Sequence, residues 1–183
     1  ASRIGELATL EMGKPIAEGR GEASHCASSL AEDVDEIVDA LRTEILEDKR
    51  TRTELHHDAF GVCVAITPWN FPVLMPHQSV LPALVAGNTV ILKPAPETPR
   101  CAELIAEACW AAGIPRDVVQ FVRCPDNEVG RRLVSHPAVG AVILTGSLET
   151  ADLFRSWKPQ LNLLAETSGK NALVVSPNAD LDL

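Results

Sequence analysis

The chain has 183 residues, the size of about one domain at ~100–200 residues per domain, and 46% of them are hydrophobic, enough to bury a core. Twenty-five acidic and sixteen basic residues give a formal net charge of −9. This balance argues against nucleic-acid and anionic-membrane partners, which bind basic surfaces. No apolar run reaches the ~20 residues of a membrane-spanning helix. The polar N-terminal segment does not have the apolar centre of a signal peptide.

The cysteine pattern argues against a stapled or zinc-bound fold. Five cysteines lie at positions 26, 63, 101, 109 and 124, and no two of them form a Cys-x-x-Cys pair. An odd count with these spacings disfavours a disulfide scaffold. We therefore expect reduced, mostly buried thiols in a cytoplasmic protein. His56 and His57 have no third ligand nearby in the sequence, so we expect no metal site.

The first 58 residues are expected to be helical and then extended. Residues 3–12 are expected to form a helix that ends at Gly13. Apolar residues spaced three and four apart predict a longer helix over residues 23–46. Residues 51–57 are interpreted as an extended strand of a smaller subdomain or an interface arm. We divide the chain into an N-terminal segment, residues 1–58, and an α/β domain, residues 59–183.

From residue 60, short apolar runs alternate with helical stretches. The runs, expected to be strands, cover residues 60–66, 88–94, 118–122, 141–145, 161–165 and 172–176. Helices are expected over residues 73–86, 100–112, 127–135 and 149–157. This alternation predicts an α/β fold with a doubly wound, mostly parallel sheet. Near the end of the chain, Asn178 or Asp180 resembles the cap of a further helix, so we expect a domain truncated at its C-terminus.

Polar segments follow four of the expected strands. They cover residues 67–72, 93–99, 145–149 and 166–170. Parallel sheets bind ligands beyond the carboxyl ends of their strands, so these segments predict a site with an amide, an ammonium, a hydroxyl and a carboxylate. Each residue also has an ordinary structural interpretation. Ser147 is of a type common at helix N-caps, and Trp69 could be a core aromatic. The joint placement favours a site.

The common nucleotide-binding motifs are absent from the sequence. It contains neither a Gly-x-Gly-x-x-Gly fingerprint nor a P-loop. A nucleotide would need its phosphates held elsewhere. The helix start after Gly146 and Ser147 is a candidate, because free backbone N–H groups and the helix dipole favour an anion there.

Four motifs carry a resemblance to a known family. They are ITPWNFP at 66–72, GNTVILKPAPETP at 87–99, LTGSLE at 144–149 and AETSGKNALVV at 165–175. In order and spacing they resemble the aldehyde dehydrogenase superfamily, and the segment at 6–22 is also similar to that family. The resemblance covers essentially the whole chain. Residues 156–183 are most similar to the L-glutamate γ-semialdehyde (pyrroline-5-carboxylate) dehydrogenases, including those fused to proline dehydrogenase.

The resemblance implies two catalytic residues. Asn70 matches the asparagine whose side-chain amide helps to form the oxyanion hole, where a fixed donor typically contributes ~3 kcal/mol. Glu166 matches the general base that activates water to hydrolyse the thioester intermediate.

The resemblance also implies a site for NAD, with NADP possible. Lys93 matches the lysine that hydrogen-bonds the adenosine ribose, and Ser147 the helix start that meets the pyrophosphate. The family's ribose-binding glutamate falls on Pro96, with Glu97 beside it, which leaves the choice between NAD and NADP open. The full set of matched cofactor positions is Ile66, Thr67, Pro68, Trp69, Lys93, Gly130, Gly146 and Ser147.

The family's nucleophile is missing from the sequence. It is a cysteine a few dozen residues beyond the general base, and no cysteine here follows Cys124. We expect the cysteines present to be structural, because a reactive thiolate needs an exposed, polar setting. The chain would then be the cofactor half of an aldehyde dehydrogenase and inactive alone. The intact enzyme would be a homo-oligomer that oxidises a small aldehyde, best assigned as L-glutamate γ-semialdehyde of proline catabolism.

Three alternatives stay open from the sequence. The chain could be a non-catalytic nucleotide-binding module that keeps Lys93 and Ser147 for binding only. It could be a fragment with no function of its own, which would expose apolar surface. Within the enzyme class, it could belong to a dehydrogenase for another semialdehyde.

Overall fold

A parallel sheet forms the centre of the molecule. The computed structural model describes residues 2–124 and 128–179. Five parallel strands lie in the order β5-β4-β3-β6-β7, which confirms the predicted α/β fold. These strands are β3 (Val62–Thr67), β4 (Thr89–Pro94), β5 (Val119–Phe121), β6 (Val139–Thr145) and β7 (Asn162–Glu166).

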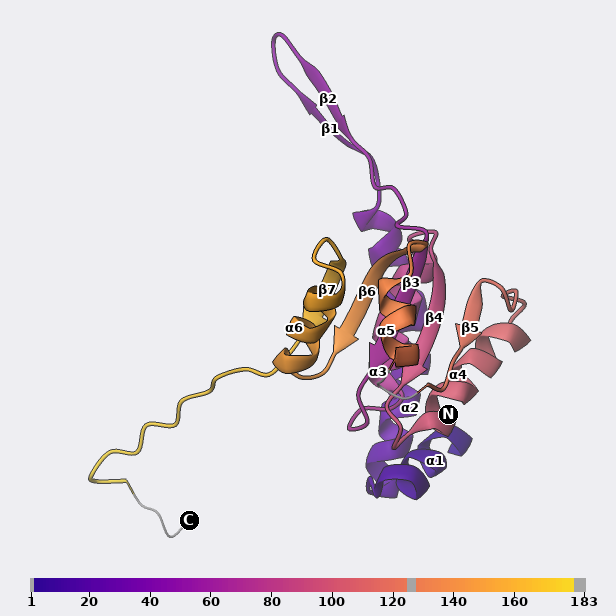
Figure 1. The fold of residues 1–183 in the computed structure, drawn as a ribbon, viewed down its shortest axis with the longest axis vertical. Coiled ribbons are helices and arrows are strands. Elements are labelled where there is room, and N and C mark those ends of the chain that lie inside the picture. Colours follow the sequence, from indigo (N-terminus) through magenta and orange to yellow (C-terminus); the bar gives the residue numbers. More distant parts are fainter. Residues whose placement is uncertain (1, 125–127, 180–183) are drawn as a thin grey trace.

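Helices cover both faces of this sheet (Figure 1). On one face lie α3 (Leu74–Val85) and α4 (Pro99–Ala111), and on the other α5 (Glu128–Ser135) and α6 (Leu148–Trp157). Helical crossovers join the parallel strands, since a hairpin turn cannot connect them. The expected strands from residue 60 to residue 166 and the helices between them differ from the observed bounds by at most two residues at each end.

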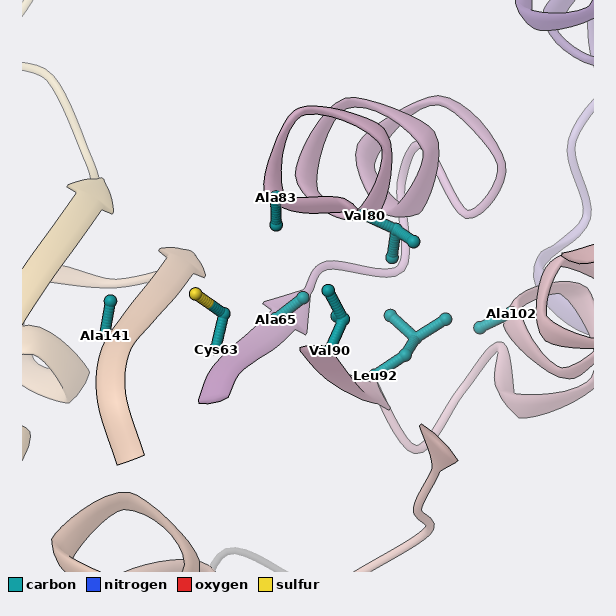
Figure 2. Close-up of a cluster of buried hydrophobic side chains, with 8 residues drawn as sticks. All are labelled: Cys63, Ala65, Val80, Ala83, Val90, Leu92, Ala102 and Ala141. Carbon is teal, nitrogen blue, oxygen red and sulfur yellow. The ribbon is translucent and has the colours of Figure 1, made fainter. Parts of the chain in front are cut away.

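Alternate residues of β3 contribute to two separate cores. Cys63 and Ala65 are buried against Val80 and Ala83 of α3, whose side chains point down onto the strands in Figure 2. Val64 belongs to the other layer, with α5 and α6. A strand buried on both faces needs the continuous apolar run that the sequence shows.

The N-terminal helices pack tightly against each other and against the α3–α4 layer. They are α1 (Ser2–Met12) and α2 (Ile16–Ala40), which contact α4 and α3 respectively. Their crossing requires two glycines. A Cβ on Gly5 would lie 2.6 Å from the Arg20 backbone nitrogen, and one on Gly19 would lie 2.5 Å from the Gly5 carbonyl oxygen. The backbones therefore approach more closely than side chains allow.

The predicted helix over residues 23–46 is wrong at both ends. Helix α2 begins earlier, because Pro15 serves as its N-cap residue, and it ends at Ala40. Glu44–Glu47 is instead strand β1, which pairs antiparallel with β2 (Arg52–Leu55). The apolar periodicity runs on past the end of the helix, but the ladder to β2 satisfies these backbone groups instead. The β1–β2 ribbon is exposed throughout and projects away from the sheet (Figure 1).

The predicted strand over residues 172–176 is also wrong. These residues form no strand, and Leu173 is 91% exposed. A strand forms only where a neighbour accepts its backbone hydrogen bonds, and in Figure 1 this segment leads away from the sheet. Asp180 and residues 125–127 of the turn before Gly130 lie outside the described residues. Over the described ranges, no helix has the length and apolar character to cross a bilayer.

Candidate functional site

The strand order reverses beside β3, and this reversal creates a natural binding crevice. From β3 the chain builds β4 and then β5 on one side, before it returns to place β6 on the other side. The loops that leave β3 and β6 therefore diverge toward opposite faces. Open α/β sheets bind their ligands in the crevice that forms outside the carboxyl ends at such a point.

The strand register brings the four predicted segments to one edge of the sheet. Ile66 of β3 pairs with Lys93 of β4 on one side and with Leu144 of β6 on the other. Thr145 of β6 pairs with Glu166 of β7, and the Gly146 N–H donates to the Glu166 carbonyl oxygen over 3.1 Å. The strand ends are level, so the four segments leave the sheet along the same end of the strands, as the sequence predicts.

Lys93 lines a small cavity on the α5–α6 face. Its side chain is buried, with 4% of the residue exposed, and Ile66 lies beside it. The cavity has a volume of ≈ 60 Å³. Pockets for small ligands typically measure about 300–1,000 Å³, so this one holds part of a nucleotide at most. It is lined by Ile66, Lys93, Gly130, Leu133, Val134, Thr150, Leu153, Phe154 and Trp157.

Ser147 begins helix α6 and has the N-cap role that its residue type favours. Its hydroxyl accepts a hydrogen bond from the Thr150 N–H over 3.2 Å. The cap satisfies one of the free N–H groups of the first turn, and the helix dipole still favours an anion there. Glu149 already supplies one negative charge. Its own backbone N–H and the Ser147 hydroxyl hold the pKa of Glu149 below the usual range, so it is ionised at neutral pH.

The end of β3 and the following loop present groups suited to a polar ligand. The Thr67 hydroxyl is buried without a hydrogen-bond partner in the described part of the chain. Pro68 is half-buried, and Trp69 is 50% exposed, which contradicts its interpretation as a core aromatic. Asn70 is exposed in the same loop, directly before α3. An unpartnered hydroxyl and an open amide are donors that a bound ligand could use.

Glu166 lies on the opposite face from Lys93. It is exposed and lines a hollow of ≈ 380 Å³ together with Met75, Gln78 and Ser79 of α3 and Thr145 of β6. The alternation of side chains along neighbouring strands causes this division, since Thr145 and Glu166 stand one position beyond the row of Ile66 and Lys93. Asn70 does not line the hollow, although it lies in the loop that begins α3.

Comparison with known proteins decides the family. The aldehyde dehydrogenase family model matches residues 1–183. The chain belongs to the aldehyde dehydrogenase family. It is 38% identical to a glutarate-semialdehyde dehydrogenase of Pseudomonas aeruginosa, over 98% of this chain and 38% of that protein. The chain therefore spans well under half the length of the curated relatives that it matches.

Two solved structures show how broadly the aldehyde dehydrogenase match extends. A succinic semialdehyde dehydrogenase from Streptococcus pyogenes, in complex with NADP+, has a TM-score of 0.83 at 26% identity and covers 99% of this chain and 40% of its own. Proline utilization A from Corynebacterium freiburgense has a TM-score of 0.74 at 42% identity, and the match covers 90% of this chain and 16% of that protein. The relatives differ in their named substrates, so membership of the family does not identify one aldehyde.

Four of the five cysteines of this aldehyde dehydrogenase chain lie in surroundings that favour the protonated thiol. Burial raises the pKa of four thiols above the ordinary value, those of Cys26, Cys63, Cys101 and Cys109. For Cys26 the pKa rises to about 11. Cys124 follows β5, and β5 and β7 are the two outermost strands of the sheet. Four strand spacings separate these two strands, about 19 Å at ~4.8 Å each. Cys124 is therefore remote from Glu166.

Histidines and acids do not gather into a metal centre in the part of the chain described here. No group of three or more His, Cys, Asp or Glu side chains within those ranges is arranged to hold a metal ion. His56, at the base of the ribbon, contacts Thr43 and Glu54 instead.

Two charged residues with a bearing on the site escaped the sequence interpretation. Glu22, directly before the helix predicted over residues 23–46, is only 8% exposed and pairs with the equally buried Lys14. Glu22 also contacts the start of α3, 51 positions further along the chain. Only the position of Lys14 at a glycine-proline turn hinted at such a role, because this turn brings α1 back against α2.

Proposed function

We propose that this chain forms the cofactor-binding part of an NAD(P)-dependent aldehyde dehydrogenase. The reaction consumes an aldehyde, water and the oxidised dinucleotide, and yields a carboxylic acid, the reduced dinucleotide and a proton. The observation that carries the proposal is the convergence of the four motif segments at the level ends of β3, β4, β6 and β7. When bound, the dinucleotide supplies the oxidising power.

The cofactor residues divide by the part of the ligand that they suit. Lys93, which lines the cavity under α5 and α6, is proposed to donate to a ribose hydroxyl. The start of α6, at Gly146 and Ser147, offers backbone N–H groups to a phosphate. Pro96 puts no carboxylate where it would repel a 2′-phosphate. The proposal therefore includes both NAD and NADP, and the NADP+ complex of the Streptococcus relative supports that breadth.

Asn70 and Glu166 are proposed to act on the substrate. The Asn70 amide would donate to the oxygen that becomes negatively charged as the aldehyde carbon turns tetrahedral. Glu166 would take a proton from the attacking water, and its exposed position at the end of β7 leaves it free to reach one. The nucleophilic thiol is proposed to come from outside this chain. Burial disfavours the thiolate at four of the five cysteines, and Cys124 lies on the far side of the sheet from Glu166. The chain alone is therefore expected to bind a cofactor without turnover.

The substrate is proposed to be an aldehyde with a carboxylate, and specifically L-glutamate γ-semialdehyde. The match to proline utilization A, at 42% identity over 90% of this chain, favours this choice. Relatives named for glutarate and succinic semialdehydes support the wider class.

The intact enzyme is proposed to be a cytoplasmic homo-oligomer. The β1–β2 ribbon carries exposed apolar side chains, with Ile45, Leu46 and Leu55 each about half exposed. An isolated two-stranded ribbon is marginally stable in water, so a second chain against it would add stability. The free cysteines suit a reducing compartment.

The test uses the full-length protein that contains this chain. We expect it to oxidise glutamate γ-semialdehyde with NAD+ or NADP+, and Glu166→Gln to lower acid formation by at least about 100-fold, because general-base catalysis typically contributes 10²–10⁴-fold. The control is Glu18→Gln, an exposed acid on α2. Full activity in Glu166→Gln would refute the assignment of the base. Oxidation of other aldehydes but not of glutamate γ-semialdehyde would support aldehyde dehydrogenase activity and reject the specific substrate.

A further inference from the structure

We propose that Lys14 and Glu22, on the α1–α2 hairpin, position Asn70 for catalysis. The inference rests on the proposed function, because it assigns these two residues to the loop that carries the proposed oxyanion donor. Both residues are buried, at 8% exposed each, and both lie far from the strand ends in the sequence. Neither would touch the substrate, so their role is to hold the loop.

Glu22 supplies the cap that helix α3 does not have. The Val73 and Leu74 N–H groups both donate to one Glu22 carboxylate oxygen, over 2.9 and 2.8 Å. The N-cap residue Val73 has no side chain that could do this. A carboxylate at a helix N-terminus satisfies free N–H groups and is favoured by the helix dipole. The start of α3 is thereby tied to α2.

Lys14 completes the link and extends it toward Asn70. Its ammonium donates to the second Glu22 carboxylate oxygen and lies 4.2 Å from the centre of the Phe71 ring. Phe71 is the residue directly after Asn70. A cation over a ring face is attracted by the ring's electrons. The Lys14 side chain is buried, whereas Phe71 is 45% exposed. One buried charge pair therefore contacts the Asn70 loop at Phe71 and Val73.

Apolar packing holds this link in place. Val73 is buried with Ala23 and Cys26 of α2, and these two follow Glu22 within one helical turn. At its other end the loop continues β3, which is paired on both sides. The loop that carries Asn70 is therefore anchored to the sheet at one end and to the α1–α2 hairpin at the other. The position of its amide depends on both anchors.

The same hairpin offers a matched control in Glu11. The Arg100 and Cys101 N–H groups donate to the Glu11 carboxylate over 2.8 and 2.9 Å, so Glu11 caps α4 as Glu22 caps α3. Thr98, the N-cap residue of α4, makes no cap bond of its own. Both glutamates thus cap a helix, but only Glu22 also pairs with the buried Lys14 and holds the helix that follows Asn70. Loss of a helix cap alone would therefore affect kcat no more at Glu22 than at Glu11, once the charge of Lys14 is also removed.

The test measures kcat and KM in the full-length enzyme. Glu22→Gln and Lys14→Met should each lower kcat by about 10- to 100-fold with KM for the cofactor unchanged, since misplacing a catalytic group by about 1 Å can cost 10²-fold. Glu11→Gln should leave kcat within about two-fold. In an Asn70→Ala background, Glu22→Gln should lower kcat no further, because its effect passes through Asn70. An equal fall in both backgrounds, or no fall in either, overturns the proposal.

A second measurement covers the case in which a single substitution prevents folding. The double variant Lys14→Met/Glu22→Gln leaves no unpaired buried charge. The substitutions are made in the present chain and NMR spectra are compared with those of the unchanged chain. The Asn70 side-chain amide signal should shift in the double variant and should stay in place in Glu11→Gln. An unmoved Asn70 signal overturns the positioning role. If the full-length protein oxidises no aldehyde, the proposed function fails and the positioning role fails with it. A shift together with normal kcat refutes the positioning role alone.

Discussion

Three charged residues near the strand ends lie in different surroundings. Lys93 lies in a cavity with apolar walls, whereas Glu166 is open to solvent on the other face of the sheet. The negative charge of Glu149 is unfavourable for the phosphate binding proposed at the start of α6. The pKa of Glu149 is held low by its own backbone N–H and the Ser147 hydroxyl, so a carboxylate stands at the helix end proposed for phosphate.

Removing the Glu149 charge should strengthen dinucleotide binding. Glu149→Gln takes one negative charge from the first turn of α6, and a charge there shifts binding of an anion by about two- to five-fold. Calorimetric titration of the chain with NAD+ and NADP+ measures the gain. Asp152→Asn, one turn further along α6, is the control and should have a smaller effect. Weaker binding in Glu149→Gln would show that no phosphate approaches this helix end.

Among the helices, α1 and α2 cross so closely that their contact requires glycine. Glycines at positions 5 and 19 let the two backbones meet, and the hairpin then reaches α3 through Glu22 and α4 through Glu11. The close crossing is therefore the base on which both helix caps depend.

Two glycines of α2 should respond in opposite directions to the same substitution. Gly19→Ala should destabilise the fold by about 1–3 kcal/mol, because the new Cβ meets the Gly5 carbonyl oxygen. Gly21→Ala enters open space and should stabilise by up to about 1 kcal/mol through helix propensity. Urea unfolding followed by circular dichroism measures both midpoints. Shifts of equal sign would contradict the close-crossing account.

The whole molecule exposes apolar side chains at its C-terminal end. Leu164 of the edge strand β7 is 52% exposed, and Leu173 and Val174 are 91% and 90% exposed. Surfaces of this kind mark places where another part of a protein packs. The remainder of a full-length aldehyde dehydrogenase is the proposed covering. The division at residue 58 stays a prediction.

The local pattern predicted the sheet well, because buried strands and their helices are short and bounded by glycine and proline. It also predicted that the segments carrying Asn70, Lys93 and Glu166 leave the sheet at the carboxyl ends of their strands, which follows from strand direction alone. The sequence could not show that Lys93 and Glu166 occupy opposite faces, since this depends on register between strands. Nor could it show that Glu22 caps a helix 51 positions away, because that contact exists only after α2 packs on α3.

The most direct test of the account is dinucleotide binding by the folded chain. Calorimetric titration with NAD+ and NADP+ should show binding of at least one of them. Lys93→Met keeps the buried stem but removes the ammonium, and should weaken binding by about 10- to 100-fold, the range for a hydrogen bond from a charged group. Lys49→Met, in the exposed turn of the ribbon, should bind as the unchanged chain does. A folded chain that binds neither dinucleotide, or binds equally well without the Lys93 ammonium, would contradict the account.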